Sequence, residues 1–219
     1  MFQSFDLALF VLAIVPVLLA LTVHEAAHGY MARHYGDRTA EQLGRLTLNP
    51  LAHIELVGTI ILPLITFMFT PFIFGWAKPI PVQTRNLRNM RVGMRMVAIA
   101  GPLSNLIMAL IWAFLLGISD VVPATFQEGL SKMATIGIMI NAVLFVLNML
   151  PILPLDGGRF VDSFLSAKAS MTFQKIEPYG TWIVLGLIVT NLLWVIMGPF
   201  VSMVLVLAQV IASGVAAVF

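Results

Sequence analysis

Two histidines and a glutamate lie close together near the end of the first apolar segment of the sequence. The stretch His24-Glu25-Ala26-Ala27-His28 has the spacing H-E-x-x-H, which places both imidazoles on one face of a helix, where they can bind one zinc ion. Glu25 follows the first histidine directly and can reach a water on that zinc as a general base. Ionisable groups inside an apolar segment are expensive to bury without a partner, so the cluster indicates a functional site rather than interfacial side chains that reach for water.

A catalytic zinc ion needs a third protein ligand and one coordination position left for water. The chain contains no cysteine, so this ligand must be a histidine or a carboxylate. The candidates are His34, His53, Glu55, Asp120, Asp156, Asp162 and a few loop acids. Asp156 is favoured because it lies in NMLPILPLDGGR (148–159), whose prolines and glycines force the backbone out of a helix at the end of an apolar span. Irregular backbone at that depth is tolerated where it lines a site.

The composition is that of a membrane protein with several spans. Apolar residues make up 60% of the 219 residues and charged residues only 10%, and the mean hydropathy is +0.99. A soluble domain has about 45–50% apolar and about 25% charged residues, so no soluble globule could hide this much apolar surface. The formal charge of +2 is too small to suggest a nucleic-acid partner.

Six apolar segments could enter a bilayer, whose hydrocarbon core is about 30 Å thick and needs about 20 helical residues. They are the segments 7–30, 57–74, 96–118, 134–150, 182–197 and 200–219, and Gly198-Pro199 is a turn signal that splits the last two.

Basic residues are distributed unevenly between the loops. Eleven of the 12 Lys and Arg residues fall on one side if the segment 57–74 does not cross completely, and Pro63 and Pro71 interrupt that segment. The same topology brings Asp156 to the face where the histidines lie, because only the crossing 96–118 then separates the two spans. We therefore predict an all-α polytopic membrane protein with about five transmembrane helices and a re-entrant or half-inserted segment, which is favoured over a sixth full span.

The motifs resemble those of the site-2 protease family, the intramembrane zinc metalloproteases. HEAAH corresponds to that family's HExxH, and NMLPILPLDGG matches its NxxPxxPxDGG signature at every fixed position. The stretches 44–53 and 75–82, and AGPLSN at 100–105, are similar to the compact prokaryotic branch that lacks a PDZ domain. The resemblance covers roughly residues 23–159. Glu55-Leu56 departs from the expected Asp-Pro, without bearing on a catalytic residue.

The resemblance implies a role for five residues. His24, His28 and Asp156 would bind one zinc ion per chain, and Glu25 would activate the water. Asn148, the motif asparagine, would contact the substrate backbone or the oxyanion. A hydrogen bond that bends its own helix is the alternative for Asn148.

Other motif residues receive structural interpretations. Asn105 is expected to pack spans together, His34 to lie at the membrane interface, and His53 to order its loop rather than bind zinc. By the resemblance, the segment 75–82 would be a short β-like edge at which a substrate strand pairs.

The sequence thus predicts one membrane-embedded metalloprotease domain over 1–219, with a catalytic core at about 5–160 and a C-terminal helical hairpin at about 180–219. Its expected reaction is peptide-bond hydrolysis within or near the transmembrane segment of a single-span membrane protein. The expected location is the cell membrane, with the active site near the cytoplasmic face and with substrate and lipid bilayer as partners. Neither the substrate's identity nor the oligomeric state can be deduced from the sequence.

Two other functions are weighed against this one. A catalytically idle relative that binds transmembrane helices would not require an intact Glu25 beside three metal ligands. A metal-ion transporter would show repeat symmetry and polar residues along several spans, and neither pattern is visible.

Overall fold

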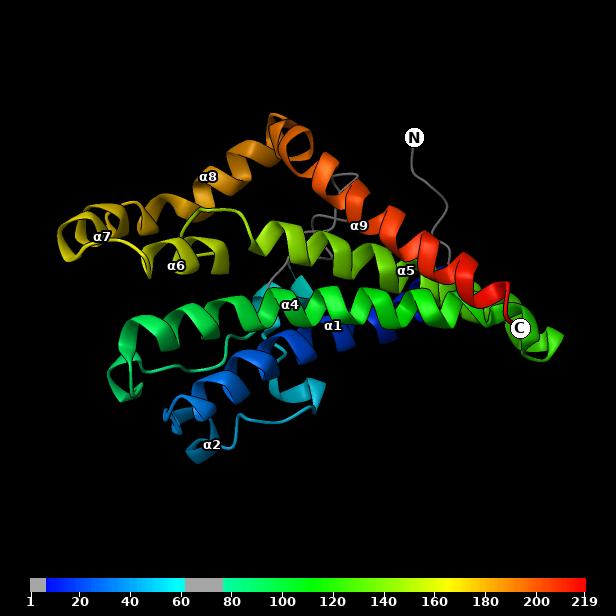
Figure 1. Ribbon diagram of the computed structural model, residues 1–219, viewed down its shortest axis with the longest axis horizontal. Helices are drawn as coiled ribbons and strands as arrows, with labels where there is room; N and C mark the ends of the chain where they lie inside the picture. Colours follow the sequence, from blue (N-terminus) through cyan, green and yellow to red (C-terminus); the bar gives the residue numbers. More distant parts are fainter. Residues whose placement is uncertain (1–6, 62–76) are drawn as a thin grey trace.

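Long helices dominate the computed structural model, which describes residues 7–61 and 77–219. Four of its helices are long and apolar enough to cross a membrane, namely α1 (Leu7–His34), α4 (Met90–Gly117), α5 (Ala124–Asn148) and α9 (Leu192–Ala216). They run along the long axis of the molecule (Figure 1), and no strand occurs among the described residues. The protein is therefore an all-α polytopic membrane protein, as the sequence predicts.

Shorter elements connect these four helices and gather mostly at one end of the bundle (Figure 1). They are α2 (Thr39–Gln42), η1 (Pro50–Ala52), the π-helical turn η2 (Leu56–Ile61), η3 (Thr84–Asn86), η4 (Ser119–Val121), α6 (Asp156–Asp162), α7 (Ala167–Gln174) and α8 (Glu177–Val189).

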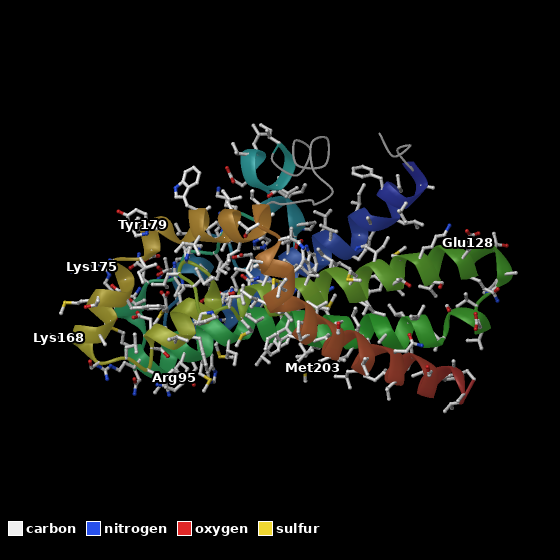
Figure 2. All side chains as sticks on the ribbon, turned by 90° about the horizontal axis from the view of Figure 1, so that it is seen from above. Arg95, Glu128, Lys168, Lys175, Tyr179 and Met203 are labelled. Atoms are coloured by element: carbon white, nitrogen blue, oxygen red, sulfur yellow. The ribbon has the colours of Figure 1, made fainter. Side chains whose placement is uncertain are left out.

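Helices α4 and α5 form the centre of the bundle, between α1 and α9. Small buried residues, among them Ala109 and Ala142, allow the helices to approach closely, as is usual between membrane helices. At Gly137 of α5 a Cβ atom would overlap the indole of Trp112 on α4. Large apolar side chains such as Met203 of α9 instead point outward (Figure 2), where lipid would surround them.

The two ends of the bundle carry different charges. Arg95, Lys168 and Lys175 lie at one end, whereas Glu128 lies at the opposite end (Figure 2). Helix α4 starts at the basic end and α5 returns to it (Figure 1), so the last turns of α1 and α5 lie toward the same end of the molecule. This is the arrangement that the loop charges predict.

The expected position of the break between the two C-terminal helices is wrong. Helix α9 continues through Gly198-Pro199, and the chain breaks instead at Asn191, whose φ of 59° lies in the left-handed region that asparagine tolerates. Pro199 is the eighth residue of α9, and its missing N–H leaves the carbonyl oxygen of Val195 without a helix hydrogen bond, which membrane helices tolerate. Helix α8, with 13 residues, is apolar but only about 20 Å long, so it adds a shorter helix to the four candidate spans of the described residues.

The expected re-entrant segment 57–74 falls largely outside the described residues. Only its beginning is described, as part of η2.

Asp37, just beyond α1, ties the end of that helix to the segment that leads into α4. Its buried carboxylate accepts hydrogen bonds from the backbone N–H and hydroxyl of Thr39, the N–H of Gln83 (2.6 Å) and the amide of Asn86 (3.1 Å). Burial alone raises a carboxyl pKa, but these hydrogen bonds outweigh it and hold the pKa of Asp37 below its ordinary value.

We expect Asp37→Asn to lower the free energy of unfolding by about 1–3 kcal/mol at neutral pH, because an amide cannot accept from all four donors. Because the folded pKa is depressed, the stabilisation is present above the ordinary carboxyl pKa of 3.8 and is lost as the pH falls through the lower folded value. Thermal midpoints of the detergent-solubilised protein should therefore differ at pH 7 and converge in acid. Glu41→Gln, which breaks only exposed ion pairs, is the control. A constant difference across pH would contradict the assignment.

Candidate metal centre

Helix α1 presents His24 and His28 to the interior of the bundle, one turn apart. Each histidine is buried, with a relative exposure of 8%, and the two Nε2 atoms lie 3.1 Å apart. The i, i+4 spacing therefore produces the shared face that the sequence predicts.

Asp156 is the first residue of α6 and reaches the same point from α5's side of the bundle. Its Oδ2 atom lies 3.2 Å from Nε2 of His24 and 3.2 Å from Nε2 of His28. The two glycines that follow allow this, because a Cβ atom on Gly157 or Gly158 would clash with the backbone of the preceding loop. The loop thus folds tightly against α6 and directs Asp156 toward the histidines.

The other ring nitrogen of each histidine faces an acceptor. Nδ1 of His24 lies 2.6 Å from Oδ1 of Asn105, and Nδ1 of His28 lies 2.7 Å from the carbonyl oxygen of Val97. We assign the proton of each neutral ring to Nδ1, since only a donor satisfies these acceptors. Both Nε2 atoms then present lone pairs to Asp156.

Three lone-pair atoms thus face one another in a largely buried space. Within residues 7–61 and 77–219, no hydrogen-bond donor reaches the buried Oδ2 of Asp156. The three atoms lie 3.1–3.2 Å from one another. Ligand atoms in a tetrahedral zinc site are expected to lie about 3.3 Å apart, which is close to these distances. Two imidazoles and a carboxylate form a donor set suited to zinc, so the residues present fit this metal.

Gly101 of α4 leaves room directly beside the histidines. A Cβ atom at this position would overlap Nε2 of His28 and would lie 2.7 Å from Nε2 of His24. Asn105 follows one turn later on the same face of α4 and holds His24. Part of the AGPLSN stretch therefore shapes the site, and Asn105 does more than pack spans together.

Glu25 lies beside the three-residue cluster and lines a cavity of about 500 Å³ together with it. Its Oε2 accepts a hydrogen bond of 2.7 Å from the backbone N–H of Ile80. Because a carboxylate has two oxygens, this bond leaves the second oxygen for another partner. Glu25 is thus held at the cavity in which a water and a peptide could lie.

Asn148, the last residue of α5, lines the same cavity. Its amide donates to the carbonyl oxygen of Leu144 at 3.0 Å, which is the local helix bond weighed above as an alternative. One amide hydrogen is left over by that bond, so a contact with substrate stays a prediction.

Residues 77–83 pass over the site without forming a strand, in contrast to the edge strand expected at 75–82. The physical reason lies in the sequence, since Pro79 and Pro81 have no N–H for a β ladder. The segment is instead held by Lys78 N–H on the carbonyl of His53, by Arg45 on the carbonyl of Lys78, and by Ile80 on Glu25. Residues 75 and 76 lie outside the described residues.

The remaining histidines do not join the cluster. His34 is exposed at the end of α1, and His53 is buried with its Nε2 2.9 Å from the carbonyl oxygen of Thr47, so it orders its loop. Within the described residues, His24, His28 and Asp156 are the group arranged to hold a metal.

Asn141 of α5 was not expected to bear on the site. It is fully buried and accepts a hydrogen bond from Asn105. A sequence signal existed, because Asn141 is a polar residue in the middle of an apolar span and lies seven residues, or about two turns, before Asn148.

Known proteins resemble this chain over most of its length. A protein of Bacillus subtilis (strain 168) named "Putative zinc metalloprotease YwhC" is 37% identical over 205 residues, which cover 92% of this chain and 90% of the relative. The chain belongs to the site-2 protease family. A sequence model described as Peptidase family M50 matches residues 116–191, a range that contains both Asn148 and Asp156.

Two mycobacterial relatives share the name "Putative zinc metalloprotease Rip2". The protein of Mycolicibacterium smegmatis is 29% identical over 186 residues, covering 83% of this chain and 68% of the relative. That of Mycobacterium tuberculosis (strain H37Rv) is 28% identical over 171 residues, covering 78% and 63%. No solved structure matches the chain. The family is one of zinc metalloproteases, so zinc is the metal that the His-His-Asp group would hold.

Gly101→Ala tests whether the space beside the histidines is a metal site. We expect the added methyl group to displace the imidazoles and to reduce the zinc content of the purified protein from about one ion per chain to a small fraction. Gly198→Ala on α9, where a Cβ atom meets no neighbour within 4 Å, is the matched control and should retain zinc. Metal analysis by mass spectrometry measures both. Full zinc occupancy in Gly101→Ala would place the metal elsewhere.

Proposed function

We propose that this protein is an intramembrane zinc metalloprotease that hydrolyses peptide bonds within or near the transmembrane segments of single-span membrane proteins. The observation that carries the proposal is the group of three lone-pair atoms, from His24, His28 and Asp156, that meet inside a helix bundle next to Glu25. Membership in the zinc metalloprotease family supports it.

In this proposal His24, His28 and Asp156 hold one zinc ion. Zinc held there would supply Lewis-acid chemistry toward a water and toward the scissile carbonyl. Glu25 accepts a proton from the attacking water as the water oxygen bonds to the carbonyl carbon. Glu25 then donates that proton to the amide nitrogen as the carbon–nitrogen bond breaks. The Ile80 N–H holds one carboxylate oxygen and thereby fixes the direction of the other.

A second cavity supports the proposal that the substrate enters from within the bilayer. It has a volume of about 270 Å³ and includes His24, Glu25 and Asn148. The rest of its lining is mostly apolar and comes from α1, α5 and α8, including Leu21, Leu144, Leu147 and Val184. An apolar chain segment would suit this lining, and its peptide bond would then lie beside Glu25.

The proposed location is the cell membrane, with the site toward the cytoplasm. His24 and His28 lie in the second half of α1, whose end is directed toward the basic end of the bundle (Figures 1 and 2). Basic loops are retained on the cytoplasmic side during insertion, which supports this orientation. Water would then reach the site over a short distance.

Glu25→Gln is expected to abolish cleavage and to keep zinc, because the amide removes the proton acceptor while the three ligands stay intact. Membrane proteomes of cells that make the wild type or this variant should differ in a small set of single-span proteins that accumulate uncut with the variant. Asp156→Ala, which removes a ligand, should lose both zinc and cleavage. An Asp156→Ala protein with full zinc occupancy and full activity would overturn the ligand assignment. Identical proteomes, with zinc bound in both proteins, would favour a relative that binds helices without cleaving them.

A further inference from the structure

Asn105 and Asn141 are fully buried side chains at the point where α1, α4 and α5 meet. Both have a relative exposure of 0%. An unpaired amide in such a place costs several kcal/mol, so both amides need partners within the bundle. Their partners form a directed chain that ends on His24.

The direction of this chain is fixed by two backbone carbonyls, which can only accept. Asn141 Nδ2 donates to the carbonyl oxygen of Gly137 at 2.9 Å, so its Oδ1 is the atom that faces Asn105. Asn105 Nδ2 donates to that Oδ1 at 3.0 Å and to the carbonyl oxygen of Ala20 at 3.2 Å. The Oδ1 of Asn105 therefore faces Nδ1 of His24.

The two histidines differ in the group that accepts the hydrogen bond from Nδ1. His28 donates to the carbonyl of Val97, whose orientation the α4 backbone fixes. His24 donates to a side-chain amide, which could rotate by half a turn and present its NH₂ group instead. An amide in that orientation would repel the Nδ1 proton and favour the other tautomer, with a proton on Nε2 in place of the lone pair.

We propose that Asn141 is a positioning residue for the metal centre, acting through Asn105 to hold His24 with its proton on Nδ1 and its Nε2 lone pair directed at the metal. This inference rests on the proposed role of His24 as a zinc ligand. Residues that orient metal ligands typically change metal affinity by about 10–100-fold when they are replaced. Asn105 contacts the ligand and should lie at the upper end, and Asn141 at about 10-fold.

The test is the zinc dissociation constant of the full chain in detergent, measured by competition with a chromophoric chelator. Asn141→Ala and Asn141→Leu both remove the chain of hydrogen bonds but change the side-chain volume in opposite directions. We expect both to weaken zinc binding about 10-fold. Asn141→Asp should retain the affinity, because a protonated carboxyl group can donate to Gly137 and accept from Asn105.

Two further comparisons distinguish the proposed positioning role of Asn141 from a purely structural role in packing. Ser119→Ala removes another buried polar group, a hydroxyl that donates to the carbonyl oxygen of Leu116, and should leave the zinc affinity unchanged. Thermal midpoints of the metal-free proteins report packing independently of zinc. In a double-mutant cycle, Asn141→Ala should have no further effect on zinc affinity once Asn105→Ala is present, because Asn141 acts through Asn105.

An unchanged zinc affinity in Asn141→Ala or Asn141→Leu, with only a lower midpoint, would overturn the inference, and so would additive losses in the cycle. These results would leave the proposed function intact. A His24→Ala protein that binds zinc as tightly as the wild type would overturn both.

Discussion

In the tautomers assigned above, Nε2 of His24, Nε2 of His28 and Oδ2 of Asp156 are all acceptors and lie within 3.2 Å of one another, and the rest of the structure around them depends on this contact. Such a group is unfavourable without a cation, since none of the described residues donates to the buried Oδ2 in these tautomers. The bundle holds the arrangement because each of the three side chains is positioned by a neighbour. An amide positions His24, a backbone carbonyl positions His28, and a glycine-rich turn positions Asp156. Zinc held by these three side chains would therefore couple metal affinity to helix packing.

One stripe of α4 does most of this work. Val97, Gly101 and Asn105 follow one another at intervals of four residues and so lie on one face of the helix. Val97 holds one histidine, Gly101 leaves space at the two Nε2 atoms, and Asn105 holds the other histidine. Helix α4 thus positions both histidines of α1, although none of its own side chains belongs to the His-His-Asp group.

The sequence allowed the meeting of His24, His28 and Asp156 to be predicted, because their placement follows from periodicity and membrane topology. The i, i+4 spacing fixes the two histidines on one face, and the distribution of basic residues brings Asp156 to the same end. The break before α9 was misjudged at Gly198-Pro199 because a turn signal of soluble proteins carries less weight where neighbouring helices support the backbone. The role of Asn141 depends on three helices meeting at one point, which no local pattern contains.

The hydrogen bond from Ile80 to Glu25 could not be predicted from the sequence either, because its donor is a backbone N–H. This bond affects how a substrate could bind here. Neighbouring N–H groups of an extended chain point in opposite directions, and the prolines at 79 and 81 remove those on either side of Ile80. The Ile80 N–H itself is engaged by Glu25. In the proposed function, a substrate strand beside this segment would meet carbonyl acceptors rather than a full ladder, and those of Lys78 and Pro79 already accept from Arg45. The substrate would therefore have to supply the donors. A locally unwound helix has such free N–H groups, and pairing them would offset part of the cost of exposing them within a membrane.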